Sequence, residues 1–198
     1  SILAHFNSTF FANNKESLSG DSLPPVISIS SIKKDEGKSF IGKMISGKFS
    51  ERFKRVLYLN PEIMQGFPPS VTVFNYSKSE TAFSGNTVYD WLDAIGIEIR
   101  EYDLILLELD ELGRFTLNDN LIKGIRSHLF VVSSERVWSE ADSRALSLFT
   151  KRTSTPPMVI LNHIEIDRLE AIIGELPKQR TFVRKAIKRI VTFNFKRS

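Results

Sequence analysis

The chain has 198 residues, which fits one domain, and its composition of 41% hydrophobic and 25% charged residues is typical of a globular protein with a substantial core. It has no cysteine, which excludes disulfides and cysteine-based zinc sites, and it contains neither an apolar run that could span a bilayer nor an opening signal peptide. The net charge is only +4, but from Lys178 onward every ionisable side chain is basic.

The first half of the chain predicts a strand, a helix and a second strand. Residues 1–25 are polar, with three phenylalanines, and we expect an arm or linker there. Residues 26–30 are rich in β-branched residues after a Pro-Pro breaker and predict a strand. Helical periodicity begins at Ser39, and residues 55–59 predict a second strand. Residues 61–86, rich in Pro, Ser and Gly, are expected to be mostly irregular.

The second half alternates helices and strands. Further strands are predicted at residues 104–107, 129–133 and 158–161, and further helices at 87–97, 140–149, 164–173 and 180–191. This alternation predicts an α/β fold, a three-layer sandwich with a mostly parallel sheet. We expect one domain over residues 26–177, followed by a basic helix and tail over 178–198. In such sheets ligands bind beyond the carboxyl ends of the strands.

One motif between the first strand and the first helix points to phosphate binding. Gly37-Lys38-Ser39 places backbone N–H groups and a helix N-terminus where they can meet phosphate oxygens. The lysine would reach the β- and γ-phosphates and the serine hydroxyl would bind Mg²⁺. The alternative is a capped helix start with a surface lysine. The predicted nucleotide-binding residues of this loop are Lys34, Asp35, Glu36, Gly37, Lys38, Ser39 and Phe40.

Polar side chains end two later strands of the predicted sheet. The second strand leads to Asn60 and Glu62, and the third ends at Glu108, with Asp110 nearby. Carboxylate and amide oxygens are suitable Mg²⁺ ligands. Taken alone, each of these strand ends is an ordinary polar terminus.

The order of these motifs resembles that of the bacterial tyrosine kinases, the cytoplasmic domains of Wzc-type polysaccharide co-polymerases. These belong to the MinD/ParA-type P-loop ATPases. The resemblance rests on the loop at residues 31–39, on residues 60–62 as the second acidic motif, on Tyr102-Asp103 and four apolar residues before Glu108 as the Walker B strand, and on Leu161-Asn162. It implies MgATP binding, with metal ligands Ser39, Glu62 and Glu108, catalytic residues Lys38, Asn60, Glu62 and Glu108, and Asn162 beside the adenine.

The chain departs from the family pattern at several positions. The aspartates expected at the second acidic motif and at Walker B are Asn60, Glu62 and Glu108, and an amide cannot act as a general base. Ile32 replaces the leading glycine of the loop, and the tail has no tyrosine to be phosphorylated. The sequence therefore favours a domain that binds a nucleotide and transfers phosphate slowly or not at all.

The resemblance also implies a biological setting. It suggests a tyrosine-kinase-like domain of an exopolysaccharide, capsule or lipopolysaccharide chain-length and export regulator. Such a domain would lie in the cytoplasm at the inner face of the bacterial inner membrane, within a longer membrane-anchored protein. Its partners would be the co-polymerase and export machinery. The resemblance also allows an oligomer, although the family's upstream oligomerisation motif has no match in this chain. The alternatives are a non-catalytic scaffold of the same fold and a MinD/ParA-like switch ATPase at a membrane.

The basic tail and a few isolated residues complete the sequence expectations. The tail is either a solvated helix face or a contact for anionic lipid head groups or an acidic partner, and nothing else in the chain supports a nucleic-acid partner. Lys33 occupies the position of the MinD/ParA signature lysine, but without the flanking glycines it is interpreted as a surface residue. His163 is interpreted as a surface or edge histidine, with a place in the nucleotide site as the alternative.

Overall fold

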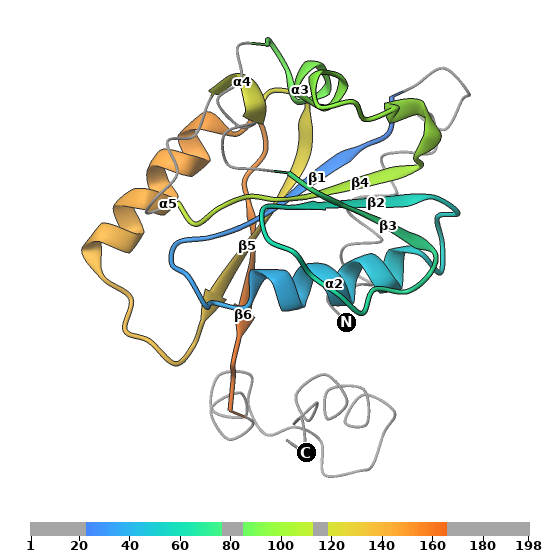
Figure 1. Cartoon of the computed structure of the whole chain (residues 1–198). Helices are drawn as coiled ribbons and strands as arrows, with labels where there is room; N and C mark the ends of the chain where they lie inside the picture. The colour runs from blue at the N-terminus through green and yellow to red at the C-terminus, as the bar shows by residue number, and fades with distance from the viewer. Residues whose placement is uncertain (1–22, 77–84, 113–118, 166–198) are drawn as a thin grey trace.

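Parallel strand pairing organises the molecule (Figure 1). The computed structural model describes residues 23–76, 85–112 and 119–165. Within these residues six strands form one sheet in the order β3-β2-β4-β1-β5-β6, and each neighbouring pair is parallel. The strands are β1 (Val26–Ser31), β2 (Val56–Asn60), β3 (Val71–Asn75), β4 (Leu104–Glu108), β5 (Ile125–Ser133) and β6 (Met158–Asn162). The predicted three-layer α/β fold with a mostly parallel sheet is therefore confirmed.

Helices cover both faces of the sheet. They are α2 (Lys38–Phe49), α3 (Val88–Ala94), α4 (Asp119–Ile122) and α5 (Glu140–Arg152), with a short 3-10 helix η4 at Ile99–Glu101. Helix α2 packs on one face, where Ile27, Tyr58 and Leu106 belong to one buried cluster. Helices α3 and α4 pack against the alternate side chains of the central strands on the opposite face, and α5 covers part of β5 on that same side. Strands β1, β2 and β4 are buried along their whole length, as a sheet covered on both faces requires.

The expectation of irregular structure over residues 61–86 is wrong for Val71–Asn75, which forms edge strand β3. Its Val-Thr-Val-Phe alternation is the missed signal, because Val71 and Val73 pack into the cluster beneath α2.

The helix predicted at 164–173 lies outside the described residues except for its first two, which are not helical, and the helix predicted at 180–191 lies wholly outside them. In the part of the chain that the structure describes, no helix is long and apolar enough to cross a membrane.

The register of the sheet brings the predicted functional strand ends together. Leu59 of β2 pairs with Leu107 of β4, and Ile29 of β1 pairs with Glu108. Asn60 and Glu108 therefore end adjacent strands on the face that α2 covers, beside the loop that follows β1. Parallel pairing alone produces this juxtaposition, because it places all carboxyl ends at one edge.

A buried histidine lies within the sheet away from that edge. His128 of β5 is 1% exposed, and its Nδ1 lies 2.7 Å from the Ser28 hydroxyl of β1. Its ring meets Phe149 of α5 edge-on, and its Nε2 has no hydrogen-bond partner in the described part of the structure. Burial lowers the pKa of His128 to about 4, so the ring is neutral in the folded protein at neutral pH.

This depressed pKa predicts a pH-dependent stability. Between pH 6.5 and 4 the unfolded chain binds a proton at His128 that the folded chain does not, so the free energy of unfolding should fall as the pH drops, by up to about 3 kcal/mol. Urea unfolding across this range measures the effect. His128→Gln, which cannot be protonated, should flatten the slope, and an unchanged slope in that variant would show that other groups cause it.

Candidate active site

The loop after β1 enters helix α2 through a left-handed glycine. Gly37 is the N-cap of α2 with φ +87°, and no side chain caps the helix there. A β-carbon at this position would overlap the side-chain amide of Asn162, so both the backbone angle and the space require glycine. Helices α3 and α5 differ, because each begins with a full capping box. The first N–H groups of α2 are thus left for a ligand such as phosphate.

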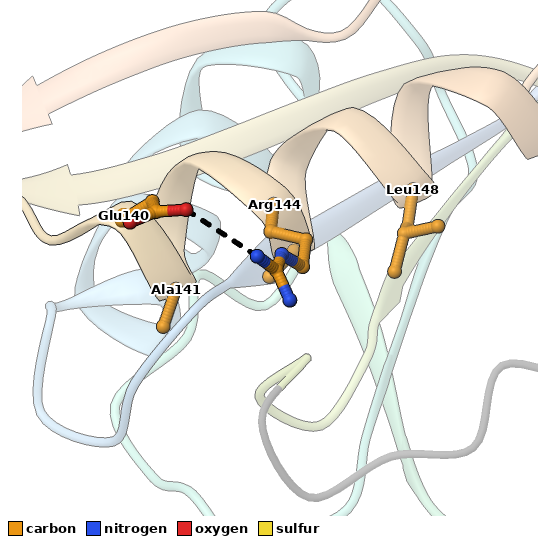
Figure 2. A pocket seen from close by; sticks show the side chains of 5 residues that line it. Glu140, Ala141, Arg144 and Leu148 are labelled. Carbon is orange, nitrogen blue, oxygen red and sulfur yellow. Dashed lines mark hydrogen bonds and ion pairs between the residues drawn. The ribbon is translucent and has the colours of Figure 1, made fainter.

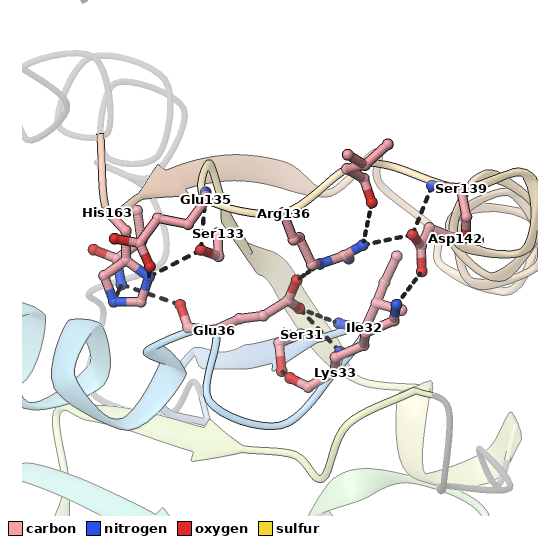
Figure 3. Close-up of polar contacts among 12 residues, drawn as sticks. Ser31, Ile32, Lys33, Glu36, Ser133, Glu135, Arg136, Ser139, Asp142 and His163 are labelled. Carbon is pink, nitrogen blue, oxygen red and sulfur yellow. Dashed lines mark hydrogen bonds and ion pairs between the residues drawn. The ribbon is translucent and has the colours of Figure 1, made fainter. Parts of the chain in front are cut away.

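Glu36 shapes this loop from within (Figure 3). Its carboxylate is 2% exposed, and Oε2 accepts hydrogen bonds from the backbone N–H groups of Ile32 and Lys33, both at 2.9 Å. The other oxygen accepts a hydrogen bond from Arg136 Nε at 2.5 Å. The side chain therefore holds the loop closed on itself, and only the backbone of Glu36 is available to a nucleotide.

Arg136 connects the loop to the start of α5. Its Nη1 donates to Asp142 at 2.5 Å, and Asp142 also accepts from the Ser139 backbone N–H in the capping box (Figure 3). Burial acts to raise the pKa of Asp142, but the hydrogen bonds from Ser139 and Arg136 outweigh it and lower this pKa to about 2. Asp142 is thus charged at neutral pH, and the Arg136 guanidinium bridges it to Glu36. Lys33 lies 4.0 Å from Asp142 and stays 56% exposed, as expected of a surface lysine.

Lys38 and Ser39 both face the end of β4. The Ser39 hydroxyl donates to Glu108 Oε1 at 2.6 Å, and Lys38 Nζ lies 3.7 Å from the same oxygen. Glu108 is 2% exposed, and burial raises its pKa despite the hydrogen bonds from Ser39 and Tyr58 and the charge of Lys38. Of the residues predicted to bind phosphate or metal, Lys38 and Ser39 therefore lie together beside the Glu108 carboxylate.

Two buried tyrosines also contact Glu108. The Tyr58 hydroxyl of β2 donates to Glu108 Oε2, and the Tyr76 hydroxyl donates to the Glu108 backbone carbonyl at 2.5 Å. Burial raises the pKa of both tyrosines, so both remain protonated donors. No motif in the sequence around either residue predicts a role in the site.

Asn60 and Glu62 follow the next strand. The side chain of Asn60 is fully buried, and neither its amide nitrogen nor its oxygen has a hydrogen-bond partner among the described residues. Glu62 is exposed, and its charge contributes to raising the pKa of Glu108. A buried unpaired amide costs about 1–3 kcal/mol, so a polar group that reached Asn60 would be favoured.

The end of β6 closes the other side of the loop. Asn162 Nδ2 donates to the Glu36 carbonyl at 3.1 Å and lies 3.2 Å from His163 Nε2. His163 adopts a left-handed backbone with φ +58°, and its Nδ1 lies 3.0 Å from the Ser133 hydroxyl of β5 (Figure 3). A neutral ring with its proton on Nδ1 satisfies both contacts. Both residues lie against the loop, with Asn162 holding its backbone.

The remaining predicted residues lie at the outer rim. Lys34 and Asp35 are exposed, and Phe40 in the first turn of α2 is 45% exposed. Sequence reasoning missed Arg136, Asp142, Tyr58 and Tyr76. The Ser-x-x-Asp capping pattern of residues 139–142 was a usable signal for Asp142, whereas no local pattern marks Arg136.

The arrangement fits a magnesium–nucleotide complex better than a metal held by protein alone. In the described ranges no group of three or more histidine or acidic side chains could hold a metal. Mg²⁺ commonly takes only one or two protein oxygens and completes its shell with phosphates and water. The Ser39 hydroxyl and Glu108 Oε1, 2.6 Å apart, supply such a pair.

A hollow on α5 lies apart from these residues. Figure 2 shows that it is lined along one helix face by Glu140, Ala141, Arg144, Ala145 and Leu148. Glu140 and Arg144 pair at 3.3 Å across it, and both are largely exposed. A surface formed by one helix, without a buried polar group, offers no catalytic chemistry, so the site is assigned to the loop and the strand ends.

Comparison with known proteins supports the fold. No protein-family model and no curated sequence matches the chain. Among solved structures, the kinase domain of VpsO aligns with a TM-score of 0.56 at 13% identity, covering 83% of this chain and 96% of that one. The kinase domain of the Escherichia coli tyrosine kinase ETK gives 0.50 at 13%, covering 82% and 74%. A ParA family ATPase from Chlorobium tepidum TLS gives 0.50 at 16%, covering 76% and 81%. The chain thus has the P-loop NTPase-type fold.

The bridge through Arg136 should contribute strongly to stability. Arg136→Ala leaves two buried carboxylates without their shared cation, so we expect a loss on the order of 3 kcal/mol in the free energy of unfolding. Arg144→Ala on helix α5 is the control, because its exposed pair with Glu140 is worth only about 0.5 kcal/mol. Equal losses in the two variants, measured by urea unfolding, would contradict the assigned role of Arg136.

Proposed function

We propose that this chain is a nucleotide-binding P-loop domain of the bacterial tyrosine-kinase type that binds MgADP and MgATP and transfers phosphate slowly. One observation carries the proposal. Lys38 and Ser39, which follow a left-handed Gly37 at an uncapped helix start, both meet the carboxylate that ends the adjacent strand β4. P-loop sites for nucleotides combine a lysine that contacts phosphate with a hydroxyl and a carboxylate that hold Mg²⁺, and these three groups meet here.

The residues of the chain have separate roles in this proposal. Backbone N–H groups at the start of α2 bind phosphate oxygens, and Lys38 turns from Glu108 toward the β- and γ-phosphates. Ser39 and Glu108 hold Mg²⁺, with the exposed Glu62 at the rim, and the metal when bound neutralises charge on the phosphates. Asn162 and His163 border the loop on the side proposed for the adenine.

The acidic positions support slow transfer. Asn60 stands where a general base would be needed, and its amide cannot accept a proton in that role. Glu108 carries its carboxylate one methylene further out than an aspartate, and such a displacement can cost about 10²-fold in rate. Binding and chemistry are therefore separable in this chain.

The biological role that we propose follows the family resemblance. The domain would belong to a regulator of polysaccharide chain length and export, on the cytoplasmic side of a bacterial inner membrane. A non-catalytic scaffold of the same fold is the second candidate, and the ion pair of Lys38 with Glu108 favours it, because the phosphate-binding lysine is already neutralised.

Nucleotide binding is the first test. Calorimetry should detect ADP and ATP binding in the presence of Mg²⁺, and Lys38→Ala should weaken it by at least about tenfold because a cation that contacts phosphate is lost. Lys48→Ala is the control, since Lys48 lies in the last turn of the same helix and pairs with exposed Glu51. Absence of binding at millimolar nucleotide would reject the proposal and leave the scaffold.

Phosphoryl transfer is tested separately. Incubation with labelled MgATP should give little or no phosphotyrosine, since Asn60 cannot act as a base. Asn60→Asp restores a carboxylate beside Glu108 and should raise hydrolysis or phosphorylation above the wild type. Robust tyrosine phosphorylation by the wild-type chain would contradict slow transfer while leaving nucleotide binding intact.

A further inference from the structure

We propose that Tyr58 and Tyr76 are positioning residues that hold the Glu108 carboxylate in place for the metal of the nucleotide complex. This inference rests on the proposed function and goes beyond it, because neither tyrosine belongs to the phosphate-binding loop or to an acidic motif. Both are fully or nearly fully buried, at 0% and 3% exposure, and both hydroxyls end on the same residue.

Each of the three oxygen atoms of Glu108 has its own partner among the surrounding side chains. Oε1 receives Ser39 and faces Lys38, Oε2 receives the Tyr58 hydroxyl, and the backbone carbonyl receives the Tyr76 hydroxyl. Glutamate has one more side-chain torsion than aspartate, so an unsupported carboxylate here would sample several rotamers. With Tyr58 on Oε2, the other oxygen stays directed at Ser39 and the phosphate site.

Helix α2 is shaped to admit the Tyr58 hydroxyl. Gly42 lies one turn into α2, and a β-carbon there would overlap the Tyr58 hydroxyl and lie 2.8 Å from two of its ring carbons. The Tyr58 ring also packs against Phe67, with centroids 4.9 Å apart. A glycine inside a helix lowers the stability of the helix by about 1 kcal/mol relative to alanine. Glycine at position 42 is therefore unfavourable for the helix itself, and the space needed by the Tyr58 hydroxyl accounts for its presence.

The test separates metal positioning from general stabilisation. We define the magnesium factor as the dissociation constant of ADP in EDTA divided by that in excess Mg²⁺, both measured by calorimetry on the full chain. Tyr58→Phe keeps the ring and removes only the hydroxyl, and it should lower the magnesium factor about tenfold, the effect of one hydrogen bond to a charged group. The affinity of Tyr58→Phe for ADP without Mg²⁺ should stay within about twofold of the wild-type value. Tyr76→Phe should act in the same direction.

Tyr89→Phe is the matched control. The Tyr89 hydroxyl also donates to a backbone carbonyl, that of Pro24 at 3.0 Å, which precedes β1 at the opposite end of the sheet. The magnesium factor of this variant should equal that of the wild type. In a Glu108→Gln background, Tyr58→Phe should have no further effect on the factor, since its action passes through the carboxylate.

The possible results distinguish failure of the proposed function from failure of this inference. A wild-type chain that binds ADP neither with nor without Mg²⁺ would overturn the proposed function and this inference together. Wild-type binding with an unchanged magnesium factor in both tyrosine variants would overturn the inference alone, as would an equal loss of ADP and MgADP affinity, which indicates a structural role. Should Tyr58→Phe reduce the folded population, Tyr76→Phe carries the same test through the backbone carbonyl.

Discussion

The buried carboxylate of Glu108 is the constraint on which the site depends. It lies at the carboxyl end of a central strand, and the loop after β1, strand β2 and the residue after β3 each send a donor or a cation to it. A charge in this position is tolerated only if such partners compensate its desolvation. The same contacts that stabilise the folded chain therefore also place Lys38 and Ser39, the side chains proposed to bind phosphate and metal, beside one carboxylate.

A second charged network holds the loop from the other side. Glu36 binds two backbone N–H groups of its own loop, and Arg136 joins it to Asp142 at the start of α5. The loop conformation is thus fixed by side chains that bind one another and the loop backbone. This arrangement leaves the backbone of residues 36–39 and the side chains of Lys38 and Ser39 as the groups proposed to meet a nucleotide, and it holds the loop in shape although Ile32 stands at the place of the leading glycine.

The sequence predicted the sheet well because its central strands are continuous apolar runs, which short-range patterns reveal. It failed at β3, whose two core-facing valines are separated by one exposed threonine and which follows Gly66, Pro68 and Pro69. The glycine, lysine and serine of the loop were found from a local motif. Tyr58, Tyr76 and Arg136 were not, because their roles come from contacts 32 to 100 residues away in the chain. Only strand order and register bring such residues together.

The contact between Gly42 and Tyr58 also limits how this protein can change over time. A larger residue at position 42 is excluded while the tyrosine is present, and loss of the tyrosine leaves the glycine as an empty notch in the helix. Each substitution is thus harmful until the other has occurred. In sequences that diverge from this chain, positions 42 and 58 should therefore change together. Tyrosine at position 58 combined with a residue other than glycine at position 42 should be rare.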